Sequence, residues 1–152
     1  MTLVAWIALC ACRGPVAGDL RTDLEGLAAR TQLPDSVVAV RWMTEAGQLG
    51  RTASGRADAK VYAWVTMAGP ADAWLTTELG TPLGERQHRV KDPVAAVLFT
   101  PELRQSLPRD ERKRSWKLAC VKYPPYAIGK GEYRGDVVLG CDDHLYLALG
   151  AR

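Results

Sequence analysis

Four cysteines fall into two pairs, and the second pair sets the firmest limit on how this chain folds. Cys10 and Cys12 close an apolar N-terminal run, whereas Cys120 and Cys141 stand at the ends of two strand-like segments far downstream. A leader followed by a chain that keeps two cysteines is typical of an exported protein with one disulfide. Because the enclosed loop has about 20 residues, the Cys120–Cys141 bridge is expected to contribute about 3 kcal/mol to stability.

The first twelve residues predict an export signal. Residues 3–11 are uncharged and apolar; such a run is too short for a membrane-spanning helix of about 20 residues and suits a signal peptide. The stretch from Leu9 to Cys12 resembles a bacterial lipobox, in which the cysteine is lipidated. We therefore expect a leader over residues 1–12, a lipid on Cys12, and a lipoprotein of the periplasm or cell envelope. The alternative is a buried first element of a cytosolic protein, because no basic residue precedes the apolar run.

The remaining length and charge indicate one domain without a strong preference for nucleic acid. About 140 residues remain after the leader, which is enough for a single domain with its own core. The formal net charge of +3 is too small to indicate nucleic-acid binding by itself. Membrane contact is then expected only through the lipid on Cys12.

The first part of the mature chain predicts helix. Asp19 can cap an amphipathic helix, which Pro34 would end. The next segment is ambiguous, because Ser36 can cap a helix whereas the valines from Val37 onward favour a strand; we favour the helix. This N-terminal part, residues 13–54, is predicted to hold helices at 19–32 and 36–46, followed by a linking segment at 48–59.

From Lys60 the pattern changes to short strands separated by Gly- and Pro-containing loops. In residues 60–69, small or aliphatic side chains alternate with polar or aromatic ones, as a half-buried strand requires. The sequence predicts strands at 60–69, 73–79, 94–99, 115–123 and 133–141, the last continued at 144–149, with a helical turn at 101–107 and loops at 80–84 and 108–114. This order predicts a mainly β (α+β) fold, a small five-stranded OB-like barrel over residues 55–152.

Four stretches carry a resemblance to a known family. They are Lys60–Val65 (KVYAWV), Leu98–Phe99, Leu118–Cys120 (LAC) and Gly135–Cys141 (GDVVLGC). Together they resemble the bacterial OB-fold family of secreted and lipoprotein domains called tRNA-anti-like, over about residues 55–149. The resemblance implies a small barrel and carries no tRNA-directed activity with it.

A basic segment next to aromatic residues predicts a surface for an anionic ligand. Residues 104–117 contain six Lys and Arg, against three acidic residues in and beside this segment, Glu102, Asp110 and Glu111. OB-folds bind strands and sugars by stacking bases or rings on aromatics beside a basic groove. The predicted ligand-facing residues are Trp64, Arg112, Arg114, Trp116, Tyr123 and Tyr126. The alternative is a solvated loop whose aromatic neighbours only pack; an exported protein also rarely meets nucleic acid, so a glycan, an anionic envelope polymer or a protein is expected.

Metal binding and catalysis find little support in the sequence. Cys141-Asp142-Asp143-His144 with Cys120 contains zinc-ligand types, but no paired ligand spacing accompanies them. A nucleophilic cysteine would need a lowered thiol pKa and a base such as His88 or His144. Because the sequence also has no nucleophile elbow, phosphate loop or paired-carboxylate motif, we expect neither a metal, a cofactor nor an enzymatic activity.

Three functions remain open at this point. The preferred one is a non-catalytic binding module of the bacterial cell envelope. The alternative is a small inhibitor or immunity lipoprotein that blocks a toxin or an envelope enzyme by inserting the loop Tyr123–Glu132. The third is a structural envelope subunit, which an exposed apolar patch on the barrel would indicate.

Overall fold

The computed structural model describes residues 18–46 and 59–152. The predicted leader, the lipidated Cys12 and nearly all of the predicted linking segment 48–59 lie outside the described residues. None of the helices in the described part of the chain is long and apolar enough to cross a membrane.

The fold is mainly β, as predicted. The described residues form an antiparallel sheet in the order β1-β2-β7-β6-β5-β3, with the short β4 paired to β5. The seven strands are β1 (Val37–Ala46), β2 (Ala59–Met67), β3 (Gly84–Lys91), β4 (Arg109–Asp110), β5 (Ser115–Tyr123), β6 (Tyr133–Cys141) and β7 (His144–Ala151). Since β1 and β3 stand at opposite ends of this order, the sheet is open and is not a closed barrel.

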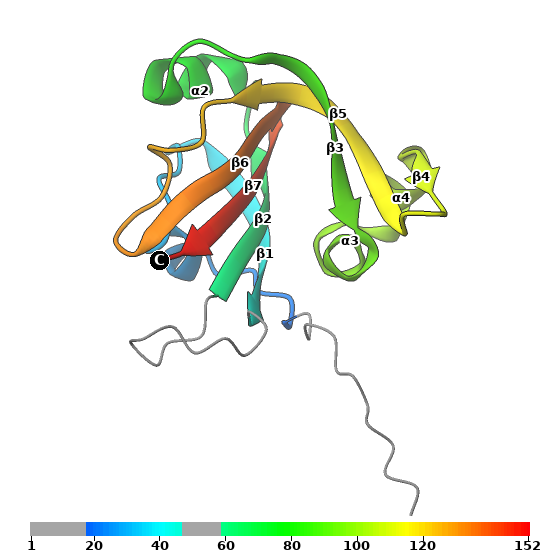
Figure 1. Cartoon of the computed structure of the whole chain (residues 1–152). Helices are drawn as coiled ribbons and strands as arrows, with labels where there is room; N and C mark the ends of the chain where they lie inside the picture. Colours follow the sequence, from blue (N-terminus) through cyan, green and yellow to red (C-terminus); the bar gives the residue numbers. More distant parts are fainter. Residues whose placement is uncertain (1–17, 47–58) are drawn as a thin grey trace, which may run out of the picture.

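The sheet divides into two leaves, because β5 and β6 pair along a short stretch only. Val121–Tyr123 pair with Val138–Gly140, whereas the remaining residues of β5 pair with β3 and β4. We call β1, β2, β7 and β6 the large leaf, and β5, β3 and β4 the small leaf (Figure 1). The predicted disulfide between Cys120 and Cys141 is confirmed, with Cα atoms 5.0 Å apart. It joins the two leaves where their strands meet.

Four short helices lie in the connections between strands, and one of them, α3 (Asp92–Leu98), packs between the two leaves. The others are α1 (Leu24–Ala28), α2 (Asp72–Leu79) and α4 (Pro101–Ser106). Helix α3 contacts β1 and β2 of the large leaf and β3 and β5 of the small leaf. Arg41 of β1 donates from Nε to the Leu98 carbonyl (2.8 Å) and from Nη2 to the Val97 carbonyl (3.0 Å). These bonds satisfy carbonyls that a helix end leaves without intrahelical partners.

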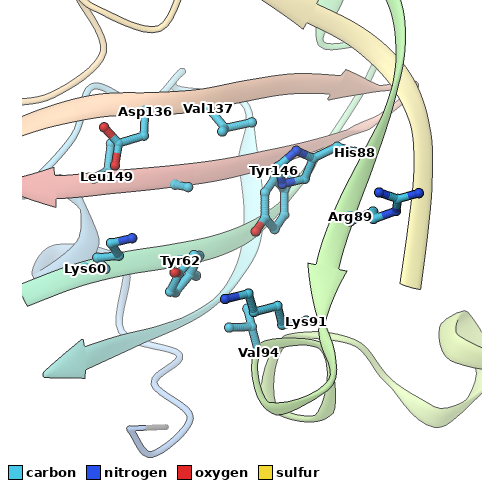
Figure 2. Close-up of a pocket in the computed structure, with 11 residues that line it drawn as sticks. Lys60, Tyr62, His88, Arg89, Lys91, Val94, Asp136, Val137, Tyr146 and Leu149 are labelled. Carbon is cyan, nitrogen blue, oxygen red and sulfur yellow. The ribbon is translucent and has the colours of Figure 1, made fainter. Parts of the chain in front are cut away.

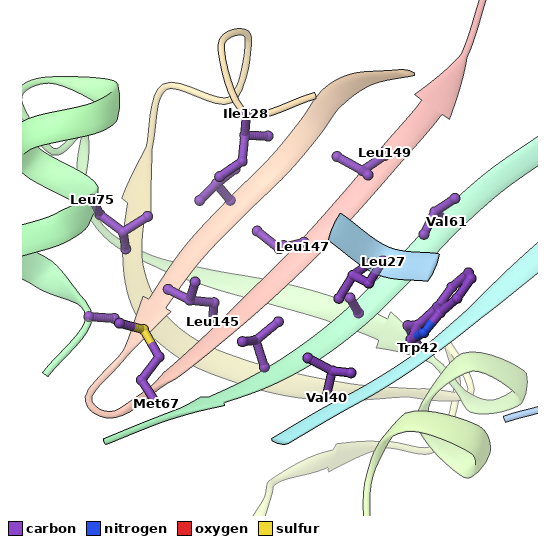
Figure 3. Packing of buried hydrophobic residues seen from close by; sticks show 14 of the residues in the cluster. Leu27, Val40, Trp42, Val61, Met67, Leu75, Ile128, Leu145, Leu147 and Leu149 are labelled. Atoms are coloured by element: carbon purple, nitrogen blue, oxygen red, sulfur yellow. The ribbon is translucent and has the colours of Figure 1, made fainter. Parts of the chain in front are cut away.

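Buried side chains form two clusters, one on each face of the large leaf. The inner cluster lies between the leaves and includes Val94 of α3 and Tyr146 of β7, both drawn in Figure 2. The outer cluster covers the opposite face under α1, α2 and the β5–β6 loop (Figure 3). Strand β7 serves both, since Leu145, Leu147 and Leu149 face outward while Tyr146 faces inward, as the period of two in a strand requires.

Three predicted elements are wrong in type. Within the predicted helix 36–46, Val37–Ala46 form strand β1 instead, in which Val37 and Val40 pair with β2 and Val38 is exposed at a bulge. Residues 73–79 lie in helix α2 and residues 94–98 in helix α3, rather than in strands. In α3, Pro93 occupies the first turn, where its missing N–H costs nothing, and Val94, Ala95 and Leu98 form one buried helical face.

Other differences concern length and the edge of the sheet. Helix α1 covers only Leu24–Ala28 of the predicted 19–32, and Asp23 caps it instead of Asp19, accepting from the Gly26 amide at 3.0 Å. Strand β3 was not predicted at all, because Val90 is its single fully buried residue. The predicted segments at 60–69, 101–107, 115–123, 133–141 and 144–149 are confirmed as β2, α4, β5, β6 and β7.

Candidate functional site

A cleft of about 220 Å³ opens between the large leaf, strand β3 and helix α3 (Figure 2). Strand β2 contributes Lys60 and Tyr62 to its wall, and β3 contributes side chains from the facing leaf. We call it the cationic cleft. Its lining residues are Lys60, Tyr62, His88, Arg89, Lys91, Val94, Asp136, Val137, Tyr146, Ala148 and Leu149.

Positive charge predominates in this cleft. Lys60, Arg89 and Lys91 line it together with a single carboxylate, that of Asp136. Within the described residues, neither Lys60 nor Lys91 forms an ion pair with a carboxylate. Arg89 lies 3.8 Å from Asp110, but its side chain is 48% exposed, so water screens that pair. The uncompensated lysines therefore favour an anion in the cleft.

Two tyrosines line the cleft with hydroxyls that stay protonated, and the Tyr62 hydroxyl already donates to Glu45. Burial raises the pKa of Tyr62 to about 12, and the Glu45 carboxylate, which accepts its hydrogen bond, acts in the same direction. Tyr146 is only 1% exposed, and burial raises its pKa further, with a smaller contribution from nearby Tyr62. Both hydroxyls thus keep their protons at neutral pH.

His88 supplies a neutral ring at the wall that β3 forms. Burial, followed by the charge of Lys122, lowers its pKa below the ordinary value, which favours the uncharged imidazole. The ring stands 5.2 Å from the ring of Tyr146, so that β3 and β7 touch across the cleft. Val94 and Ala148 add apolar surface to the walls, which strengthens electrostatic interactions inside.

Two of the sequence-predicted ligand residues lie in the core. Tyr123 is 2% exposed and belongs to the outer cluster. Trp64 is 8% exposed; its ring meets Phe99 edge-on at 5.3 Å and stacks on His144 at 4.8 Å. Both rings therefore use their aromatic surface for packing, which is the alternative that the sequence left open.

Two of the six cations of the predicted basic segment, Arg109 and Arg114, lie beside carboxylates. Arg109 donates to Asp92 (2.8 Å) and to Glu111 (2.6 Å), and Arg114 approaches Asp92 at 3.9 Å. The Arg109 hydrogen bond is the main cause that holds the pKa of Asp92 below its usual value. The Arg109 guanidinium also lies 5.5 Å from the centre of the Trp116 ring. Arg109 and the Trp116 ring are thus engaged within the protein.

The six predicted residues do not meet at one site. Arg112 and Arg114 are exposed beside the start of β5, next to Trp116. Tyr126 is 81% exposed, and it follows the opposite end of β5 in the chain. Strand β3 contributes His88, Arg89 and Lys91 to the cationic cleft. The sequence did not predict these residues as part of a site, because it did not predict strand β3.

A second hollow, of about 440 Å³, lies beside the disulfide. Its walls include Trp64, three leucines, and Asp143 and His144 of the β6–β7 turn, whose side chains are 2.7 Å apart. Cys120 and Cys141 are bonded to each other here and offer no thiol. In the described part of the chain, no group of three or more His, Cys, Asp or Glu side chains is placed to hold a metal ion.

A scan against protein-family models, a search of curated proteins and a search of solved structures each found no match to this chain.

Proposed function

We propose that this protein is an exported, lipid-anchored, non-catalytic binding module of the bacterial cell envelope, and that its cationic cleft holds an anionic group of the ligand. One observation carries the ligand class. Lys60 and Lys91 line the same cavity as two protonated tyrosine hydroxyls, and within the described residues neither lysine has a carboxylate partner. Export and anchoring are supported by the apolar leader and the lipobox-like Cys12.

The cleft chemistry suits recognition of a small phosphate or carboxylate group. The lysines supply charge, the Tyr146 hydroxyl supplies a directed donor, and the apolar walls reduce competition from water. An anion bound this way needs no proton transfer or covalent step, so the proposal includes no turnover.

We also propose a distant relationship to the tRNA-anti-like family. The four resembling stretches fall on β2, the end of α3, β5 and β6, and the cysteines in the last two are bonded. The open seven-stranded sheet differs from a closed five-stranded barrel, so the relationship would require the barrel to have opened and gained strands.

One observation favours the second candidate, an inhibitor or immunity lipoprotein. Tyr126 projects from the β5–β6 loop with 81% of its surface exposed, as an anchor residue for a partner protein would. Ile128, two residues further along this loop, is fully buried and anchors the loop to the domain. Its carbonyl accepts hydrogen bonds from the Gln32 amide (2.8 Å) and the Thr31 hydroxyl (2.9 Å). Only the loop tip is therefore available to enter an active site.

Thermal unfolding of the full chain with inorganic phosphate tests the anion site. A ligand that binds only the folded state raises Tm in proportion to its affinity, but phosphate also stabilises proteins generally through exclusion from their surface. The comparison with Lys60→Ala/Lys91→Ala removes this general effect. We expect the rise in Tm to be larger in the wild type than in the double variant, while Lys113→Ala, an exposed lysine outside the cleft, behaves as the wild type. Equal rises in all three proteins would contradict the proposal.

Crosslinking in the native envelope separates the two candidates. A single protein recovered in stoichiometric amount, and lost with Tyr126→Ala, would favour the inhibitor. Retained anionic polymer or lipid without a protein partner, insensitive to Tyr126→Ala, would favour the binding module.

A further inference from the structure

The described chain begins at the end of the sheet where Lys60 of the cationic cleft lies. The Gly18 amide donates to the Thr44 carbonyl at 3.0 Å. In the pairing of β1 with β2, Thr44 lies opposite Val61, and the next pair is Glu45 with Lys60. Figure 1 shows the first described residues in blue at the end where β1 and β7 stop and β2 starts.

The chain between this point and the lipid is short. Five residues separate Cys12 from Gly18, and the six Cα-to-Cα steps between them span at most about 20 Å even when fully extended. A lipid on Cys12 therefore keeps this end of the sheet within about 20 Å of the bilayer surface.

We propose that the cationic cleft takes the phosphate headgroup of an anionic phospholipid in the membrane that holds the Cys12 lipid. The inference rests on the proposed function, since it uses both the anchor and the anion site. Lys60 and Lys91 provide charge for the phosphate oxygens, and the Tyr146 hydroxyl, which points into the cleft (Figure 2), provides a donor. Anionic lipids also attract each lysine near the surface by about 1 kcal/mol.

Tethering makes even a weak headgroup site effective. A short flexible link converts the second binding event into an intramolecular one with an effective concentration in the millimolar range. The exposed leucines close to the tether, Leu20 and Leu24, are 41% and 47% exposed and offer apolar surface at the same end of the chain. The headgroup contact would thus fix the orientation of the whole domain on the membrane.

Co-sedimentation with phospholipid vesicles tests this proposal. The full chain carries Cys12→Ser throughout, so that no lipid contributes and the leader is the same in every protein. We expect affinity to rise with the phosphatidylglycerol fraction in phosphatidylcholine vesicles. Lys91→Ala should weaken binding about 5-fold and Lys60→Ala/Lys91→Ala about 30-fold, as expected for about 1 kcal/mol per lysine. Lys113→Ala removes the same charge outside the cleft and should keep the starting affinity.

A cavity-filling variant separates headgroup entry from simple surface attraction. Ala148→Leu adds volume inside the cleft without changing charge, since Ala148 lines it and is 7% exposed. If the phosphate enters, this variant should bind vesicles as weakly as Lys91→Ala. Affinity equal to that of the starting protein would overturn the proposal. Where thermal melting shows that Ala148→Leu does not fold, Tyr146→Phe makes the same test by removing the hydroxyl donor of the cleft.

Soluble glycerol 1-phosphate distinguishes failure of this inference from failure of the proposed function. Binding of the soluble anion in the cleft, together with vesicle binding that Lys60→Ala/Lys91→Ala leaves intact, would overturn the headgroup site and keep the anion site. Failure to bind either would overturn both.

Discussion

At the scale of single residues, the cationic cleft combines fixed charges with side chains whose protonation burial controls. Lys60 and Lys91 are exposed at its rim, whereas Tyr146 is buried at its wall and Tyr62 and His88 are half-buried. The pKa shifts of Tyr62 and His88 both favour the uncharged form. The inner groups are therefore neutral donors, and the charge that attracts a ligand stays at the rim.

The raised tyrosine pKa values predict a loss of stability at alkaline pH. In the folded protein the pKa of Tyr62 is about 12, against 10.0 for the free side chain. The folded state therefore holds its proton more tightly, and the stabilisation is complete below pH 10 and falls as pH rises toward 12. Urea unfolding at pH 9 and pH 11 should show a smaller decrease for Tyr62→Phe than for the wild type. Tyr126→Phe, at an exposed tyrosine, should decrease as the wild type does.

His88 should report the bound anion directly. Burial and Lys122 lower its pKa below 6.5, so its proton uptake on acidification occurs below the ordinary range, and its contribution to stability is lost as pH falls. An anion in the cleft favours the charged imidazole and should raise this pKa. NMR titration of the His88 ring with and without glycerol 1-phosphate checks both directions; an unchanged His88 titration in bound protein would place the anion elsewhere.

At the scale of the elements, α3 and the edge strand β3 build the cleft, and these are the elements that sequence patterns describe least well. The apolar run in α3 is compatible with a buried strand as well as with a helix. Its packing against both leaves, which the sequence pattern does not contain, determines that it is a helix. Strand β3 is almost entirely polar because it lies at the edge of the sheet. Strands β5, β6 and β7 were predictable because their apolar residues and turns follow standard strand patterns.

Arg41 fixes α3 to the large leaf, and its removal should destabilise the fold. Arg41→Ala leaves the Val97 and Leu98 carbonyls without their side-chain donors. Loss of two partly buried hydrogen bonds to a charged donor is expected to cost about 2–3 kcal/mol. Urea unfolding measures the change. Arg86→Ala is the matched control, because exposed Arg86 donates only to the carbonyl of its neighbour Glu85, and it should change stability little; similar losses in both would contradict this role.

At the scale of the whole molecule, the cleft exists because two leaves of one sheet meet at a narrow junction. A short stretch of β5–β6 pairing and the Cys120–Cys141 bond form this junction. The disulfide followed from the export signal and the strand ends, which are local features of the sequence. The cleft could not be predicted from local features, because its residues come from β2, β3, α3, β6 and β7. Only the tertiary arrangement brings these residues together.

Loss of the disulfide should loosen the junction and the ligand site together. Cys120→Ser/Cys141→Ser is expected to reduce the free energy of unfolding by about 3 kcal/mol. Because the leaves carry opposite walls of the cleft, affinity for inorganic phosphate should also fall. Unfolding and binding with and without dithiothreitol measure both effects, and the reductant should change the wild type but not the variant. Unchanged phosphate affinity in a destabilised variant would show that the cleft does not depend on the junction.

The most direct test of the central claim is an amide NMR titration of ¹⁵N-labelled full chain with glycerol 1-phosphate. We expect shift changes concentrated at Lys60, Tyr62, His88 and Lys91, and their loss in Lys60→Ala/Lys91→Ala. Shift changes concentrated at Arg112–Trp116, or none at saturating ligand, would contradict it.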